Sequence, residues 1–241
     1  MSFDRMNQMD WTYGRTMSQA ERGTIVGQVM GLLAFSLLFT AGGYVIGKVL
    51  FPGPLLFVGG IIGIIGSFVT VLALSFARTK MSSGLALGLF YLFSVFEGMA
   101  LGLILEHYLR NNMGMVVVNA AATTAGLVLV LSAYAWTTKR DLSGMGAYLM
   151  AGLLAILMAG LVMMLLSFFM PAGSLSFFGF LLSVATAVLF SGFVMYDMQR
   201  LKNAQAGFDD PIMLAIGIYL SIFNLFLAIL RIFGYLNSSD D

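Results

Sequence analysis

The sequence predicts an all-α, polytopic membrane protein with a bundle of seven spanning helices, and three observations support this prediction. Of its 241 residues, 60% are apolar and only 10% are charged, whereas soluble domains carry about 25% charged residues. The mean hydropathy is +0.96. Seven apolar stretches are each long enough, at about 1.5 Å per helical residue, to cross a hydrocarbon core about 30 Å thick. This composition excludes a soluble enzyme, a disordered chain and a secreted disulfide scaffold.

The predicted spans share long apolar runs bounded by polar residues. They cover residues 23–46, 54–77, 82–105, 114–137, 146–170, 174–197 and 212–235. Among the charged residues, only Glu97, Asp197 and Arg231 lie within them. The alternation over about ten residues that marks a membrane β-barrel is not visible. Helices are therefore the expected way of pairing the backbone polar groups in hydrocarbon.

The loops between these spans predict the orientation of the chain. The excess of Lys and Arg in short loops marks the cytoplasmic side. Nine such residues lie on the side of the N-terminus: Arg5, Arg15, Arg22, Arg78, Lys80, Lys139, Arg140, Arg200 and Lys202. The opposite side has two, Lys48 and Arg110. We expect a cytoplasmic tail over 1–22, one membrane domain over 23–235 and a short external tail over 236–241.

Small residues predict where the helices approach one another closely. In the first three spans they recur at four-residue spacing: Gly27 and Gly31; Gly59, Gly63 and Ser67; Gly84 and Gly88; Gly98 and Gly102. In the seventh span they alternate with polar residues at steps of three and four: Gly217, Ser221, Asn224, Ala228 and Arg231. Such steps keep side chains on one helix face. This stripe should face the bundle interior or water, not lipid.

The charges inside the spans are candidate functional residues, because a charge at the centre of a spanning helix costs about 3 kcal/mol or more. Depth along the helices groups Glu97, Asn119 and Arg231 in an outer polar cluster, where a structural ion pair is favoured over a transport role. Asp197 closes the sixth span on the cytoplasmic side, where Arg78 ends the second. A pair between them would seal the inner end of a polar path, and a solvated interfacial Asp197 fits equally well.

The sequence lacks the residues that several kinds of catalytic and metal chemistry require. The chain has no cysteine and one histidine, His107, so thiolate sites and a serine–histidine protease are excluded. It has no Gly-rich phosphate loop with lysine and no second histidine for a helical zinc motif. Asp197 lacks the second carboxylate of an aspartyl protease. The net charge of +1 suggests no nucleic-acid partner. We expect neither enzymatic activity nor a resident cofactor.

Several motifs together resemble the Bax-inhibitor-motif membrane family, most closely its bacterial, YccA-like branch. They are TTKRDLS at 137–143, YDMQ at 196–199, YLSIFNLF at 219–226, and Glu97-Gly98 in the third span. The resemblance covers all seven spans. It implies an N-terminus inside the cell, a seventh helix that is central and wrapped by the others, and a place in the bacterial inner membrane.

The resemblance also implies a function. Members of the family are associated with a pH-sensitive calcium leak that uses paired aspartates in spans six and seven and a latch arginine in span two. Asp197 matches the first aspartate and Arg78 the latch, but Ser221 stands where the second aspartate falls. With Asn224 and backbone carbonyls, Asp197 and Ser221 would form a weak, transient calcium site, because calcium prefers six to eight oxygens.

Two functions remain open at this point. The first is a leak pathway for calcium or protons, gated by Asp197 and Arg78 and lined by Ser221 and Asn224. The second is a modulator of the membrane AAA+ protease FtsH that transports nothing, as the YccA-like branch suggests. The serine at position 221 favours the second function, and the polar stripe of the last span favours the first.

Overall fold

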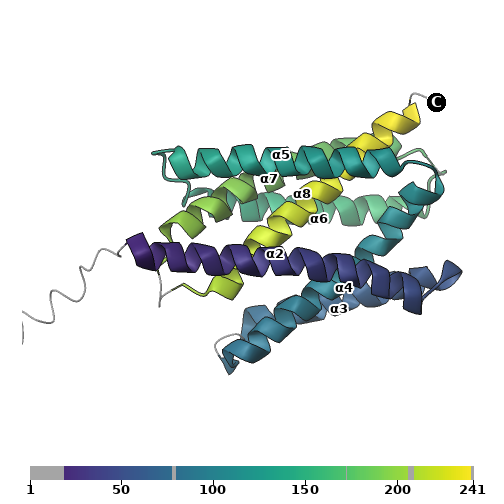
Figure 1. Cartoon of the computed structure of the whole chain (residues 1–241). Helices are drawn as coiled ribbons and strands as arrows, with labels where there is room; N and C mark the ends of the chain where they lie inside the picture. The colour runs from purple at the N-terminus through teal and green to yellow at the C-terminus, as the bar shows by residue number, and fades with distance from the viewer. Residues whose placement is uncertain (1–18, 78–79, 172, 206–208, 240–241) are drawn as a thin grey trace, which may run out of the picture.

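The computed structural model describes residues 19–77, 80–171, 173–205 and 209–239 (Figure 1). These residues form seven long helices and no strand, which confirms the all-α prediction. The helices are α2 (Gln19–Leu50), α3 (Leu56–Ala77), α4 (Ser83–Arg110), α5 (Gly114–Thr137), α6 (Met145–Ser167), α7 (Ser176–Asn203) and α8 (Pro211–Ser239), with a 3-10 turn, η1 (Gly53–Leu55), before α3. Each of the seven contains a stretch long and apolar enough to cross a membrane.

The helices follow the predicted spans closely but extend beyond several of them. The bounds of α5 are those predicted, while α2 starts at Gln19, α4 continues to Arg110 and α8 continues to Ser239. Hydropathy detects only the apolar part of a helix, whereas backbone hydrogen bonding continues through polar residues at the interface. The predicted tails at 1–22 and 236–241 therefore each contain helical residues, and Arg78 lies outside the described residues.

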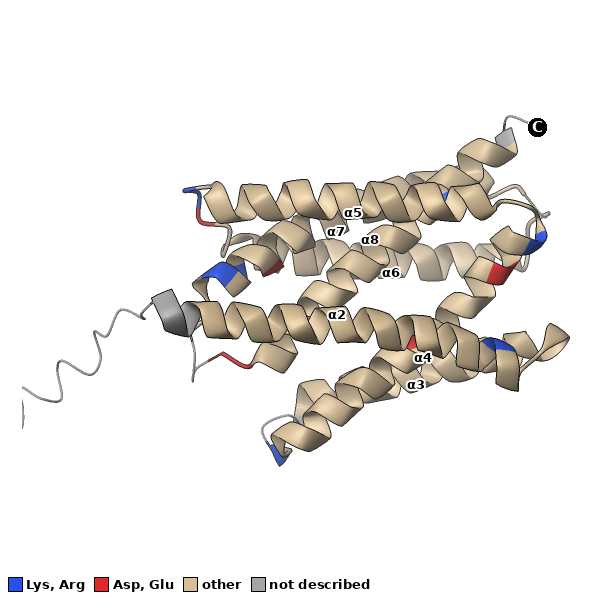
Figure 2. Cartoon of the chain, in the orientation of Figure 1, with Lys and Arg blue, Asp and Glu red and all other residues tan. Residues whose placement is uncertain are grey.

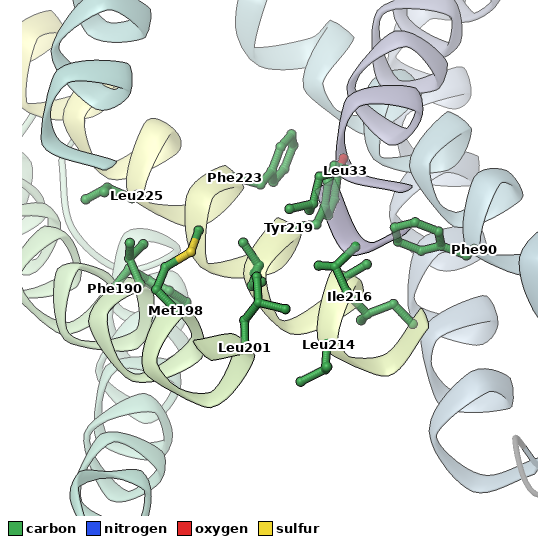
Figure 3. Packing of buried hydrophobic residues seen from close by; sticks show 14 of the residues in the cluster. Leu33, Phe90, Phe190, Met198, Leu201, Leu214, Ile216, Tyr219, Phe223 and Leu225 are labelled. Carbon is green, nitrogen blue, oxygen red and sulfur yellow. The ribbon is translucent and has the colours of Figure 1, made fainter. Parts of the chain in front are cut away.

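The last helix, α8, lies at the centre of the bundle. In its most apolar stretch 56% of the residues are buried, compared with 6% in α6 and at most 33% in the others. It packs against α7, α5, α2 and α4, and Figure 1 shows it crossing between α2 and α5. Figure 3 shows Tyr219, Phe223 and Leu225 of α8 among apolar side chains of the neighbouring helices. The expectation of a central seventh span is confirmed.

Glycines bring α2 and α4 into backbone contact. A Cβ at Gly98 would collide with the carbonyl oxygen of Thr40, and one at Gly43 with that of Val95. Gly63 likewise lies against the backbone of α4 at Ala100. The small-residue prediction fails elsewhere, because a Cβ at four of the predicted contact glycines would meet no described atom within 4 Å. These are Gly27, Gly31, Gly84 and Gly88. Spacing alone does not distinguish glycines at a helix interface from those facing lipid.

The outer surface of the bundle is apolar, and its charges lie mostly at the two ends. Phe76, Tyr148 and Phe169 are each more than 80% exposed, as expected for side chains that contact acyl chains. Figure 2 shows most described charged residues in the loops and helix ends. Buried hydroxyls donate to carbonyls one turn back, as Ser94 does to Phe90 at 3.0 Å. These hydrogen bonds give the hydroxyl groups a partner within the helix, because lipid offers none.

Candidate functional site

A cavity of about 740 Å³ lies among α3, α4, α6, α7 and α8. Most of its wall is apolar, formed by side chains such as Phe68, Leu153 and Phe193. Its polar lining comes from four helices: Ser67, Glu97, Tyr196, Asp197, Arg200, Ser221 and Asn224. Three of the four residues predicted for an ion pathway therefore line one cavity between the helices, and the fourth, Arg78, lies outside the described residues.

Asp197 and Ser221 are in direct contact across the interface of α7 and α8. The Ser221 hydroxyl donates to Oδ2 of Asp197 at 2.6 Å, and the two residues are 3% and 8% exposed respectively. Gly217, one turn earlier on α8, lies beside the same carboxyl group, since a Cβ there would be 3.4 Å from Oδ1. The small residues of the α8 stripe thus let a carboxylate approach the central helix closely.

The position of Glu97 corrects one prediction. The sequence placed Glu97 with Asn119 and Arg231 in an outer cluster, but its carboxyl group lines the cavity that also contains Asp197 and interacts with the hydroxyl of Ser67 on α3. Asn119 and Arg231 are both exposed. No ion pair or hydrogen bond joins them to Glu97 among the described residues. Depth along a helix does not decide which side chains meet, because that also depends on the rotation of each helix about its axis.

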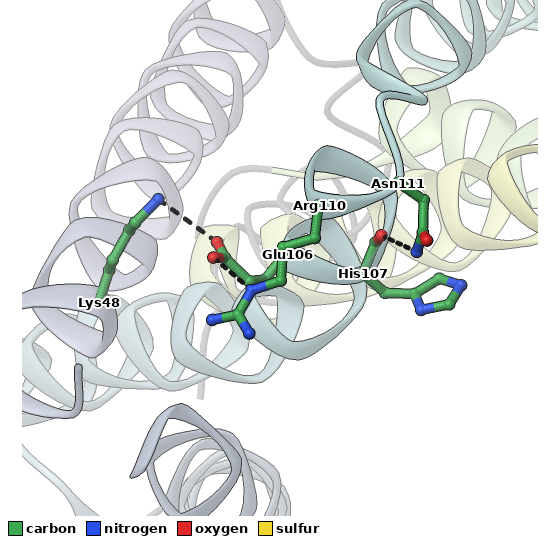
Figure 4. Close-up of polar contacts among 5 residues, drawn as sticks. All are labelled: Lys48, Glu106, His107, Arg110 and Asn111. Carbon is green, nitrogen blue, oxygen red and sulfur yellow. Dashed lines mark hydrogen bonds and ion pairs between the residues drawn. The ribbon is translucent and has the colours of Figure 1, made fainter. Parts of the chain in front are cut away.

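Among the described residues, the ion pairs lie at the end of the bundle opposite Asp197. Glu106 of α4 accepts a hydrogen bond from Nε of Arg110 at 2.9 Å, and its other oxygen lies 3.3 Å from Nζ of Lys48 on α2 (Figure 4). Glu106 and Arg110 are four residues apart in the sequence, a spacing that makes two side chains neighbours on a helix surface. The Lys48 contact joins two helices, so only the tertiary structure shows it.

Arg200 lines the cavity but was not among the site residues predicted from the sequence. It lines the cavity with Asp197, and its positive charge acts on that carboxylate. Its position three residues after Asp197 on α7 places both on one side of the helix. This spacing in the sequence could have identified Arg200 as a neighbour of Asp197. Among the described residues, Arg200 is the cation that lines this cavity.

Gln199 anchors the loop between α5 and α6 to α7, two residues after Asp197. Its Oε1 accepts from the backbone N–H of Leu142 at 2.6 Å, and its Nε2 donates to the carbonyl oxygen of Arg140 at 2.7 Å. Nζ of Lys202 donates to the carbonyl oxygen of Thr138 at 3.5 Å. The buried amide therefore holds the motif at 137–143 against the end of α7. The sequence contained both motifs but no sign of their contact.

Within the same loop, Asp141 has its own local partner. The backbone N–H of Ser143 donates to Asp141 Oδ1 at 2.9 Å. This bond favours the ionised form and holds the pKa of Asp141 below its usual range. Asp141 is exposed and does not line the cavity, so it provides a matched control for changes at Asp197.

The cavity offers oxygen ligands but no dense cluster of charge. In the described part of the chain, no three side chains of His, Cys, Asp or Glu are grouped as metal ligands. Carboxylate, hydroxyl and amide oxygens suit calcium better than zinc or copper.

Comparisons with known proteins agree with this architecture. Residues 22–238 match the family model described as "Inhibitor of apoptosis-promoting Bax1". The chain is 32% identical over 227 residues to "Inner membrane protein YbhL" of Escherichia coli, covering 88% of this chain and 91% of that one. It is 31% identical over 228 residues to an uncharacterized protein of Borreliella burgdorferi, covering 88% and 92%.

A further relative is an uncharacterized protein of Pseudomonas aeruginosa, 32% identical over 224 residues, which cover 92% of this chain and 94% of that protein. The matched region contains all seven spanning helices and both sides of the Asp197–Ser221 contact. The chain therefore belongs to the Bax-inhibitor family and is a multi-pass integral protein of the inner membrane.

Proposed function

We propose that the cavity beside α8 is part of a pathway through which a cation, calcium or a proton, leaks across the membrane. The observation that carries this proposal is that Glu97 and Asp197, two acidic residues from different spanning helices, line one cavity between the helices. Ionisable groups inside a membrane are costly, and they mark ion pathways and proton relays in membrane proteins. Glu97 extends the pathway that the sequence assigned to Asp197, Ser221 and Asn224.

In this pathway Asp197 is the gate residue. Ser221 on α8 donates a hydrogen bond to its carboxyl group on α7, so a passing cation must replace the hydroxyl as partner of the carboxylate. Conduction requires binding that is favourable enough for entry and weak enough for exit. One carboxylate with hydroxyl and amide oxygens meets that condition for calcium. Protonation of Asp197 removes the attraction, so calcium flux should fall as the pH falls.

The first test is calcium flux into liposomes that contain the purified protein. We expect Asp197→Asn to reduce the flux about tenfold, equivalent to about 1.4 kcal/mol, and to flatten its dependence on pH, because the amide cannot ionise. Asp141→Asn should leave both unchanged, since Asp141 is exposed in the loop. Wild-type flux with a wild-type pH profile in Asp197→Asn would exclude Asp197 as the gate.

The second candidate function is modulation of the membrane protease FtsH without transport. It is favoured by Ser221, because the Asp197 site lacks the paired aspartate associated with the leak in this family. The loop held by Gln199 presents exposed Lys139 and Arg140 near the same end of α7, and a partner protein can bind such a basic surface.

This function predicts that FtsH co-purifies with the full-length protein from membranes. We expect deletion of residues 1–20 to reduce the recovered FtsH several-fold, because the tail is the longest segment predicted on the cytoplasmic side. A variant with Lys139→Gln and Arg140→Gln tests the loop separately. Undiminished recovery with the deletion would rule out the tail as the contact, and no recovery with the intact chain would rule out the association.

A further inference from the structure

A second groove lies on the other side of α8, between α2 and α5. It has a volume of about 810 Å³, and residues of α8 form part of its lining. Figure 1 shows α8 crossing between α2 and α5. Apolar side chains of four helices form most of its lining, among them Leu37, Val45, Leu101, Val128 and Phe226. Nothing in the leak pathway uses this groove, which shares no lining residue with the cavity of Asp197.

The few hydroxyls in the groove are already occupied. Thr40 and Tyr219 form a hydrogen bond of 2.7 Å with each other. Thr124 donates to the carbonyl oxygen of Ala120 at 2.7 Å. The Tyr44 hydroxyl interacts with Lys48. A ligand inside the groove therefore finds mostly apolar surface, with the hydroxyls of Thr40, Tyr219 and Thr124 already hydrogen-bonded within the protein. An acyl chain fits this lining better than water, an ion or a polar metabolite does.

One end of the groove carries excess positive charge. Nζ of Lys48 lies 5.8 Å from the centre of the Tyr44 ring, which lines the groove. Lys48 and Arg110 share the single carboxylate of Glu106, so this cluster has a net charge of +1. Their side chains remain 53% and 61% exposed. Arg110 uses Nε for Glu106, and its guanidinium carries further N–H donors.

We infer that the groove binds an anionic phospholipid, with one acyl chain between α2 and α5 and the phosphate at Lys48 and Arg110. The apolar lining accounts for the chain, and the charge at the groove end accounts for the headgroup. The net positive charge of the cluster attracts a lipid phosphate, and the guanidinium and ammonium groups can donate hydrogen bonds to its oxygens. The predicted orientation places this headgroup in the external leaflet.

The test is lipid binding to the intact protein in detergent, measured by native mass spectrometry. The probes are phosphatidylglycerol and phosphatidylcholine with the same acyl chains. We expect the wild-type protein to bind phosphatidylglycerol about tenfold more tightly. The triple variant Lys48→Gln, Glu106→Gln, Arg110→Gln neutralises the cluster and leaves no unpaired charge. It should bind both lipids equally.

The acyl-chain site is tested separately by filling the groove. Ala125→Phe, on the exposed groove face of α5, should reduce binding of both lipids about tenfold. Ala133→Phe, on the same helix but outside the groove, should not. Ala121→Phe is a second filling variant if the first does not fold. Equal binding of the two lipids by the wild type, an unchanged preference in the triple variant, or unchanged binding in the filled variants would each overturn the inference.

Discussion

Replacing Gly98 by alanine should lower the free energy of unfolding by about 2 kcal/mol, the usual range for overpacking being about 1–3 kcal/mol. The added methyl group would collide with the carbonyl oxygen of Thr40 and crowd the backbone of Tyr44. These atoms belong to the backbone of α2, so a change of side-chain rotamer cannot relieve the collision. The helices α2 and α4 must move apart along their contact.

The matched control is Gly88→Ala on the same helix. A Cβ at Gly88 meets no described atom within 4 Å, and alanine favours the helical conformation by up to about 1 kcal/mol over glycine. This variant should be as stable as the wild type or slightly more stable. Unfolding in mixed detergent micelles, followed by circular dichroism, measures both. Equal stability of the two variants would contradict the backbone contact between α2 and α4.

The second large effect is expected from Ser221→Asp. The serine hydroxyl lies 2.6 Å from Oδ2 of Asp197, so an aspartate at 221 would place a second carboxyl group against the first. Two carboxylates at such separations share a proton and titrate as a pair. The repulsion between two negative charges makes the pair keep its shared proton to a higher pH than a single carboxyl group does. The pH at which calcium flux falls to half should therefore be at least about one unit higher in Ser221→Asp than in the wild type, since such groups interact by more than about one pK unit.

Ser221→Ala distinguishes the added charge from the lost hydroxyl. It removes the hydrogen bond to Asp197, which costs about 1–3 kcal/mol when a buried acceptor is left unpaired, but it adds no titrating group. Both variants are compared with the wild type by measuring calcium flux from pH 5 to pH 8. Infrared spectroscopy detects the protonated carboxylic acid in the same samples. The same pH of half-maximal flux in Ser221→Asp and Ser221→Ala would show that this contact does not control the leak.

The location of the intramembrane charges shows where sequence reasoning failed. The sequence identified Glu97, Asp197 and Arg231 as the charged residues within the spans, but it paired Glu97 with the wrong partners. Glu97 shares a cavity with Asp197, while Arg231 is exposed. Hydropathy gives depth along the membrane normal, and neither hydropathy nor loop charge gives the rotation of one helix relative to the next.

Gln199 and the groove between α2 and α5 show the same limit. The bonds from Gln199 to the backbone at Leu142 and Arg140 join segments 57 and 59 residues apart. The groove exists because α2 and α5 are held apart by α8 and not packed on each other. Neither feature follows from residue spacing within one helix.

What the sequence determined by itself is the number of spanning helices, their approximate bounds and the polar stripe on α8. These properties depend on local composition, because each span must satisfy its own backbone in lipid. The tertiary structure alone decided which stripe residues meet which partner, that Ser221 bonds to Asp197, and that Glu97 faces the same cavity. Those contacts depend on how α7 and α4 pack against α8, and packing is a property of pairs of helices that no single segment contains.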